Sequence, residues 1–180
     1  PREATAIFRF IYVGQIEKHK GISPLIEAFA KLGQEVADME LHIIGSGSRL
    51  EDVRKLVKND SRIHLYGRVE RSALPALFRT ADITVVPSLC YENSPTVIFE
   101  SWSCGVPVLA SNIEGIAELI KEGENGLTFK AGDTVELAVK IDWCIRHREE
   151  IFAMGEKTTQ SLIGLSVEEY IGKLIGLYHK

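Results

Sequence analysis

Two glutamates, Glu92 and Glu100, lie eight positions apart in the segment SLCYENSPTVIFESWSCG, residues 88–105. A carboxylate can accept hydrogen bonds from two adjacent hydroxyls, and it can stabilise positive charge that develops during a reaction. A third charged side chain, Lys20, precedes Gly21 just before a segment with helical periodicity. Its ammonium group could bind an anion such as phosphate. These three residues are the first candidates for a binding or catalytic site.

The segment after Glu92 carries the signals of a short helix over residues 95–104. Ser94 can cap this helix, Pro95 suits its first position, and Gly105 can end it. With helical spacing, Ile98, Phe99 and Trp102 form an apolar face. A narrow polar strip is formed by Thr96, Glu100 and Ser103. Glu100 is therefore a charged residue on a mostly buried helix. Either it has a function there, or the polar strip simply faces water.

The start of this helix is suited to phosphate, because the free amides of Thr96 and Val97 and the helix dipole favour an anion there. Glu100 lies about five residues along the axis, or ~7.5 Å at 1.5 Å per residue, which is roughly the reach of a diphosphate between two sugars. The pattern predicts a nucleotide lying along the helix. Glu100 would accept hydrogen bonds from the ribose hydroxyls, and Glu92 would face the other end of the ligand.

Three consecutive basic residues, Lys18, His19 and Lys20, follow the first predicted strand. They can be interpreted as a solvated turn or as positive charge near the phosphates. The solvated turn remains credible for Lys18 and His19. Lys20 is expected to bind phosphate, because it stands next to Gly21 and directly before a helix start.

Short apolar runs rich in β-branched and aromatic residues alternate with segments of helical periodicity. The predicted strands lie within residues 7–14, 39–45, 62–67, 81–88, 105–111 and 125–129, and the predicted helices cover roughly residues 23–33, 48–58, 72–80, 95–104 and 113–121. We expect Ser23 to cap the first helix, with Pro24 at its first position and Gly33 near its end. After residue 132 the pattern is helical, and it ends in an apolar stripe from Val167 to Tyr178.

Strand alternating with helix predicts right-handed βαβ units. The fold class expected is α/β, a Rossmann-like three-layer α/β/α sandwich with a six-stranded parallel sheet, formed as one domain over residues 1–180. In such sheets ligands bind beyond the carboxyl ends of the strands, near the point where the strand order reverses. The loops of interest therefore begin at Gly14, Gly45, Gly67 and Pro87.

Composition narrows the functional class. The net charge of −4 argues against a general nucleic-acid or anionic-membrane binder, because phosphate backbones are held by a surplus of Lys and Arg. No apolar run reaches the roughly 18 residues needed to cross a bilayer, and the N-terminus lacks a signal-peptide pattern, so a soluble cytoplasmic protein is expected. The cysteines, Cys90, Cys104 and Cys144, show neither a CxxC pair nor a histidine at metal-ligand spacing, so no zinc site or disulfide framework is predicted.

Five blocks follow one another along nearly the whole chain: YVGQIEKHKGISPLIEAF, LHIIGSGSRLEDV, RIHLYGRV, ADITVVPSLCYENSPTVIFESWSCGVPVLAS and IEGIAELIKEGENGLTF. In this order they resemble the C-terminal, nucleotide-sugar-binding half of GT-B fold glycosyltransferases, specifically the group-1 (family 4) class of retaining enzymes. The E-x7-E spacing alone is a weak signal, whereas five blocks in the family's order are a strong one. The chain opens at Pro1 shortly before a strand, so we expect a cut at a domain boundary, with the N-terminal acceptor domain absent.

The resemblance implies roles for individual residues. Glu100 would hold the ribose hydroxyls, Glu92 would contact the donor sugar or stabilise the reacting centre, and Lys20 would bind the diphosphate. The loop at Gly67, Arg68 and Val69 would meet the nucleobase, largely through main-chain groups. Further donor contacts are implied for the loop glycines and for the start of the helix, namely Gly14, Gly45, Ser94, Thr96 and Val97.

Two positions depart from the family's pattern. Gln15 stands where the family usually has a second diphosphate-binding arginine, which removes one positive charge. Glu114 and Gly115 stand where the family often has paired glycines, so this chain departs from the pattern that implies donor-sugar contacts there.

The function implied is transfer of a sugar from a nucleotide diphosphate, such as a UDP- or GDP-sugar, to a glycan, lipid or small molecule. The reaction would proceed with retention, without a metal or other cofactor, in the cytoplasm or at the cytoplasmic membrane face. A catalytically degenerate binding module is the main alternative, supported by Gln15. A sugar-nucleotide epimerase is a weaker one. An NAD-dependent oxidoreductase fits poorly, because Leu50 stands where G-x-G-x-x-G needs its third glycine.

Overall fold

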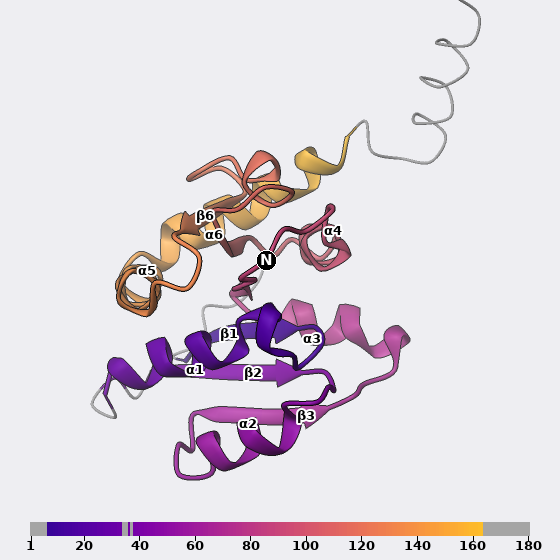
Figure 1. Cartoon of the computed structure of the whole chain (residues 1–180). Helices are drawn as coiled ribbons and strands as arrows, with labels where there is room; N and C mark the ends of the chain where they lie inside the picture. Colours follow the sequence, from indigo (N-terminus) through magenta and orange to yellow (C-terminus); the bar gives the residue numbers. More distant parts are fainter. Residues whose placement is uncertain (1–6, 34–35, 37, 164–180) are drawn as a thin grey trace, which may run out of the picture.

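The computed structural model describes residues 7–33, 36 and 38–163, and the apolar runs within these residues form one parallel sheet (Figure 1). Its six strands are β1 (Phe8–Val13), β2 (Met39–Ile44), β3 (Ile63–Gly67), β4 (Ile83–Val86), β5 (Val108–Ser111) and β6 (Gly126–Phe129). Their order is β3-β2-β1-β4-β5-β6, and all neighbouring pairs are parallel. The predicted strands and the predicted parallel sheet are confirmed. The strand order reverses between β1 and β4.

Helices cover both faces of the sheet. The α-helices are α1 (Ile22–Lys31), α2 (Leu50–Val57), α3 (Leu74–Thr80), α4 (Thr96–Ser103), α5 (Thr134–Arg146) and α6 (Arg148–Thr158), and the 3₁₀ turns are η1 (Lys18–Lys20), η2 (Arg71–Ala73), η3 (Ala117–Leu119) and η4 (Thr159–Leu162). The largest core cluster lies between one face of the sheet and α1, α2, α5 and α6. Two smaller clusters lie on the other face, under α4 and under α3. The result is the predicted three-layer α/β/α arrangement.

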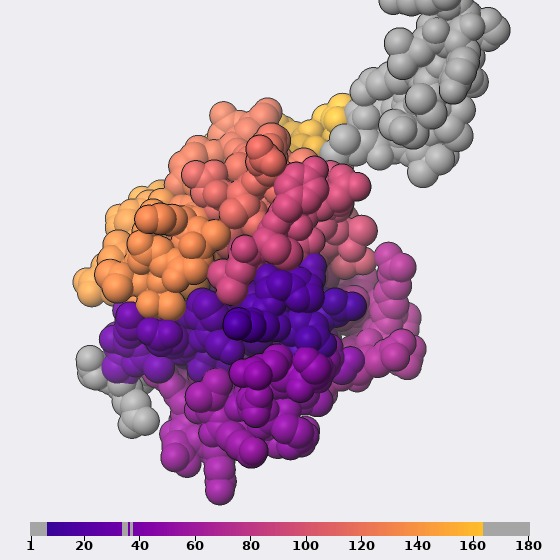
Figure 2. Space-filling view, viewed as in Figure 1, coloured from indigo at the N-terminus to yellow at the C-terminus, as the bar shows by residue number. Residues whose placement is uncertain are grey.

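The segments of the first and second halves of the chain lie on different sides of the molecule. In the space-filling view the segments from about residue 110 to 160 lie together above the indigo and purple segments of the first half (Figure 2). The strands β4 and β5 are buried throughout, as expected for a sheet covered on both faces. Strand β2 instead alternates, with Met39, Leu41 and Ile43 in the core and half-buried Glu40 and His42 on the opposite face.

Three local predictions need correction or fall outside the described residues. Helix α1 begins at Ile22, because left-handed Gly21 (φ 72°) serves as its cap, so Ser23 is not the capping residue. The predicted helix over residues 113–121 is wrong. Gly115 adopts φ 81° and Ile120 is extended, so only the short turn η3 forms there. The apolar stripe after residue 166 lies outside the described residues.

A buried arginine joins the chain after α1 to the start of β3. Arg62 donates to the Asp60 carboxylate at 2.9 and 2.6 Å and to the carbonyl oxygens of Gly33 and Val36, and its guanidinium lies over the Phe29 ring. These hydrogen bonds from Arg62 hold the pKa of Asp60 below its usual value. The pair therefore stabilises the folded chain most where Asp60 is ionised.

Among the described helices, none combines the length and the apolar character that a membrane crossing requires.

Candidate functional site

A cavity of about 460 Å³ lies at the carboxyl ends of β1 and β4. This is the point where the strand order reverses, which is where ligands bind in open α/β sheets. The loop after β1, the end of β4 and the first turn of α4 supply its walls. Its lining consists of residues 12–15, Lys20, 85–88, 92–97 and Glu100.

The structure brings Lys20 and Glu92 together, although they are far apart in the sequence. The Lys20 Nζ lies 2.5 Å from Glu92 Oε1, and the Ser88 hydroxyl donates to the same oxygen at 2.7 Å. Their side chains are 25% and 12% exposed. An ammonium group has three donors, so Lys20 can keep this contact and still bind a ligand oxygen.

Gly21 allows the loop after β1 to lie directly against the end of β4. It adopts φ 72°, and a Cβ at this position would overlap the carbonyl oxygen of Pro87. The Leu89 amide donates to the His19 carbonyl at 2.8 Å and ties the same two loops together. Lys20 is therefore placed over the cavity by main-chain packing that only glycine permits next to it.

Gly115 supports the main chain of Glu92 from the loop after β5. It adopts φ 81°, and a Cβ would overlap the Glu92 carbonyl oxygen. The Glu92 amide donates to the Glu114 carbonyl at 3.4 Å. Gly115 is thus the one glycine of the family's expected pair that is present, and close packing against Glu92 explains why glycine is needed there. Glu114 takes the place of the other glycine.

The first turn of α4 opens onto the cavity without the side-chain cap that the sequence predicts. Its cap is Pro95, with no capping side-chain hydrogen bond, and its first helical residue is Thr96. Ser94 adopts φ 52°, the only left-handed backbone of a non-glycine residue in the described part of the chain. The predicted Ser94 cap is therefore wrong, because this strained turn sets the helix start one residue later. The first amides of a helix have no intrahelical acceptor, so they are free to bind an anion.

The predicted end of α4 is confirmed, and its predicted apolar face is buried except at Phe99, which is half-buried. Gly105 follows the helix with φ 74°, and Ile98 and Trp102 are almost fully buried. Ser101 anchors the helix to β4 through a hydrogen bond of 2.6 Å between its hydroxyl and that of Thr84. This buried contact fixes which side of α4 faces the cavity.

Glu100 lines the cavity from the polar side of α4. Its side chain is 30% exposed, and its Oε1 accepts a hydrogen bond from the Arg71 guanidinium at 3.1 Å. The Arg71 side chain is 86% exposed, so this ion pair is well solvated. A ligand hydroxyl can replace Arg71 at little cost.

Eight of the twelve predicted site residues line this cavity: Gly14, Gln15, Lys20, Glu92, Ser94, Thr96, Val97 and Glu100. The other four, Gly45, Gly67, Arg68 and Val69, lie in neighbouring loops. The Gly45 amide donates to the Gly67 carbonyl at 2.8 Å, and a Cβ on Gly45 would overlap the Gly14 carbonyl oxygen. These glycines therefore bring the loops after β1, β2 and β3 together. Base binding by residues 67–69 remains a prediction.

Sequence reasoning missed three polar residues of the cavity wall, namely Tyr12, Ser88 and Asn93. The Tyr12 hydroxyl donates to the Gln15 carbonyl at 2.6 Å, and burial, with Glu92 and Glu17 nearby, raises its pKa, so the hydroxyl stays protonated. Tyr12 lies in an apolar strand and gives no sequence signal of its own. Ser88 and Asn93 could have been selected, because they flank Glu92 in the loop after β4.

Two known proteins illustrate the sequence similarity of this chain to others. The N-acetyl-alpha-D-glucosaminyl L-malate synthase of Bacillus anthracis is 29% identical over 155 residues, covering 84% of this chain and 40% of that protein. The D-inositol 3-phosphate glycosyltransferase of Pseudarthrobacter chlorophenolicus is 35% identical over 127 residues, or 67% of this chain and 30% of that protein. The chain thus spans less than half the length of these two relatives.

Solved structures share the fold. Anabaena HepE in complex with UDP-glucose superposes with a TM-score of 0.81 at 21% identity, over 94% of this chain and 49% of that one. S. aureus TarM superposes with a TM-score of 0.87 at 20% identity, over 100% of this chain and 36% of that one. The family model described as glycosyl transferases group 1 matches residues 4–161. Because this match covers most of the chain, the chain belongs to the group 1 glycosyl transferase family.

Proposed function

We propose that the cavity between the loop after β1 and helix α4 binds a nucleotide-diphosphate sugar, and that this chain is the donor-binding part of a retaining glycosyltransferase. The observation that carries the proposal is the convergence of Lys20, Glu92, Glu100 and the first turn of α4 on one cavity. Anabaena HepE has been solved with UDP and with UDP-glucose, and its fold matches this chain. That likeness supports a nucleotide sugar as the ligand.

The donor would be held by three kinds of contact. The diphosphate would bind the Lys20 ammonium and the open amides of α4, and the ribose hydroxyls would donate to Glu100. The transferred sugar would then lie beside Glu92, whose carboxylate is fixed by Lys20 and Ser88. We infer the base pocket at residues 67–69, because the amide of Gly45 joins that loop to the cavity wall.

Transfer requires the bond between the anomeric carbon and the diphosphate oxygen to break, with its electron pair leaving on the diphosphate. Lys20 and the α4 amides would stabilise this departing charge, and Glu92 would face the positive charge that develops at the anomeric carbon. An acceptor hydroxyl would bond to that carbon from the same side and pass its proton to the departing diphosphate oxygen, so the configuration is retained. This supply of positive charge by the protein is our reason to propose a metal-independent reaction.

The acceptor site would lie on the part of the protein that this chain does not include. The chain by itself is therefore proposed to bind the donor without transferring its sugar efficiently. The location proposed for the protein is the cytoplasm or the cytoplasmic face of a membrane. The acceptor class proposed is a glycan, lipid or small molecule. Gln15 in the cavity wall adds no charge, which is the specific observation in favour of a second candidate, a non-catalytic nucleotide-sugar-binding module.

A binding panel tests the proposal directly. UDP-, GDP- and ADP-sugars are added to the chain, and the thermal midpoint is measured, because a ligand that binds only the folded state raises it. One nucleotide class should raise the midpoint of the wild type and have a much smaller effect on Lys20→Ala. Lys157→Ala, an exposed lysine on α6 outside the cavity, should respond as the wild type does. If no sugar nucleotide raises the midpoint, or if both variants respond equally, the donor site is misplaced.

A further inference from the structure

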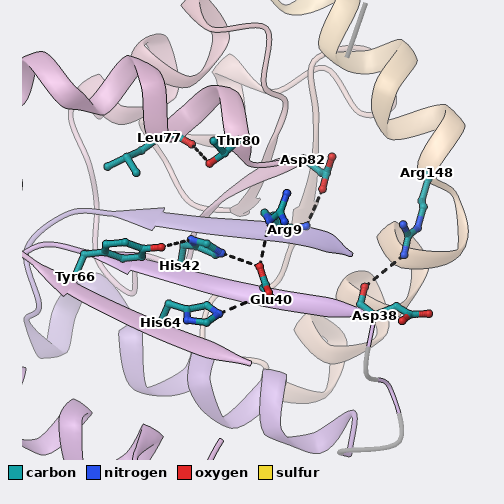
Figure 3. Close-up of polar contacts among 10 residues, drawn as sticks. All are labelled: Arg9, Asp38, Glu40, His42, His64, Tyr66, Leu77, Thr80, Asp82 and Arg148. Atoms are coloured by element: carbon teal, nitrogen blue, oxygen red, sulfur yellow. Dashed lines mark hydrogen bonds and ion pairs between the residues drawn. The ribbon is translucent and has the colours of Figure 1, made fainter. Parts of the chain in front are cut away.

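A polar cluster lies on the half-exposed face of β2 and β3, away from the cavity. It contains Glu40, His42 and His64, with Arg9 and Tyr66 at its margins (Figure 3). None of these five residues lines the cavity. The cluster therefore needs an explanation other than donor binding.

The sheet register forces these side chains together. His42 and His64 are directly paired neighbours in the parallel ladder of β2 and β3, so their side chains lie on the same face. Glu40 stands two residues before His42 and shares that face. The His42 and His64 ring centres are 4.9 Å apart. Two imidazoles and one carboxylate are thereby presented to one point above the sheet.

The distances within this cluster suit a metal ion. His42 Nε2 lies 3.1 Å from Glu40 Oε2, and His64 Nε2 lies 3.7 Å from Glu40 Oε1. Ligand atoms around a tetrahedral zinc ion lie about 3.3 Å from one another, given its bond lengths of about 2.0–2.2 Å. One ligand atom from each of the three residues lies within 4.8 Å of the others. The two imidazoles must move closer together, and His64, 40% exposed, has room to do so.

Two neighbouring groups orient the possible ligands. The Tyr66 hydroxyl lies 2.9 Å from His42 Nδ1, so with a proton on Nδ1 the Nε2 lone pair points toward Glu40 and His64. The Arg9 Nε donates to Glu40 Oε2 at 3.1 Å, which leaves Oε1 for a metal. The positive charge of Arg9 opposes any cation. This repulsion acts on every divalent cation alike. Metals with strong affinity for imidazole can offset it, whereas Mg²⁺ and Ca²⁺, which bind mainly oxygen ligands, gain little from the two histidines.

We propose that Glu40, His42 and His64 form a binding site for a divalent transition metal of the zinc class, with water completing the coordination. The ion would join the interior strand β2 to the edge strand β3. It would thereby stabilise the folded domain, because it binds only where the two strands are paired. The site is separate from the donor cavity, so zinc binding and nucleotide binding should be independent.

The test uses the chain without a polyhistidine tag, stripped of metal with a chelator. Zinc is titrated by calorimetry, and the thermal midpoint is measured with zinc and with magnesium. We expect one zinc ion per chain, a raised midpoint with zinc only, and visible absorption bands of coordinated Co²⁺. His42→Ala and His64→Ala should weaken binding by at least about 100-fold, because loss of an outer partner alone costs about 10–100-fold.

Tyr66→Phe provides a milder variant that keeps all three ligands. It should keep one zinc per chain but weaken binding about 10-fold. His19→Ala and Tyr91→Phe are matched controls outside the cluster and should bind zinc as the wild type does. Thermal midpoints measured in the presence of the chelator establish that each variant is folded without metal. Zinc binding that is absent from the wild type, or that survives loss of both His42 and His64, would overturn the proposal and leave a solvated polar face with adventitious ions only.

Discussion

Replacing Glu100 with glutamine tests how the pentose of the donor is held. The substitution keeps the size of the side chain and one acceptor oxygen but removes the charge. Hydrogen bonds to a charged group contribute about 1.5–3 kcal/mol. Against this, the carboxylate gives up its contact with Arg71 when the ribose binds. Since Arg71 is 86% exposed, that contact is worth only about 0–1 kcal/mol.

The expected net loss in Glu100→Gln is therefore about 2 kcal/mol, or about 30-fold in Kd. Isothermal calorimetry measures it with the nucleoside diphosphate that binds the wild type best. The 2′,3′-dideoxy form of the same nucleotide provides the decisive comparison, because it has no hydroxyls for the carboxylate to accept. The variant and the wild type should bind the dideoxy form with nearly equal affinity.

Glu156→Gln, on an exposed part of α6, is the matched control and should change neither affinity. The reasoning is refuted if Glu100→Gln weakens both nucleotides equally, since the carboxylate would then act on some group other than the ribose hydroxyls. It is also refuted if the ribonucleotide binds as tightly as before.

Three further predictions concern the loops and the core. Gly21→Ala should lower the free energy of unfolding by about 2 kcal/mol or more in urea titrations, because a Cβ would overlap the Pro87 carbonyl oxygen at a left-handed position; an unchanged midpoint would contradict this close packing. Asp60→Asn should cost about 2 kcal/mol near neutral pH, because it leaves buried Arg62 without its carboxylate. Folding lowers the pKa of Asp60, so the stability that Asp60 contributes is present above its unfolded-state pKa and is lost as the pH falls through its folded-state pKa. The difference in unfolding free energy between Asp60→Asn and the wild type should therefore disappear in acid. A difference that persists there would count against this role of the ion pair. Gln15→Arg should raise the turnover of the full-length protein by adding positive charge beside the departing diphosphate, and an equal or lower rate would show that no charge is missing there.

Much of the site could be predicted because it is built from a few short segments, each of which carries a local sequence signal. Parallel strands buried on both faces produce continuous apolar runs, and their carboxyl ends meet at one edge, so the loops beginning at Gly14 and Pro87 could be identified as neighbours. The positions of Glu92 and Glu100 relative to α4 followed from helical periodicity and from Gly105 at its end. These are short-range properties of the chain, which local sequence encodes.

Other features depend on contacts between distant segments. The ion pair of Lys20 with Glu92 requires the loop after β1 to press on the end of β4, and no local pattern specifies that contact. The helix predicted over residues 113–121 failed for the same reason, since Gly115 is held in a left-handed conformation against the main chain of Glu92. Local periodicity there was overridden by tertiary packing.

The parallel sheet, the family resemblance and half of the residues that line the cavity follow from the sequence alone, because strand and helix periodicity and turn glycines are properties of neighbouring residues. The strand register that pairs His42 with His64 and places Glu40 beside them is visible only in the folded chain. Register depends on how two strands align across a long connection. A shift of one residue would turn one of these histidines to the opposite face, and the cluster would not exist.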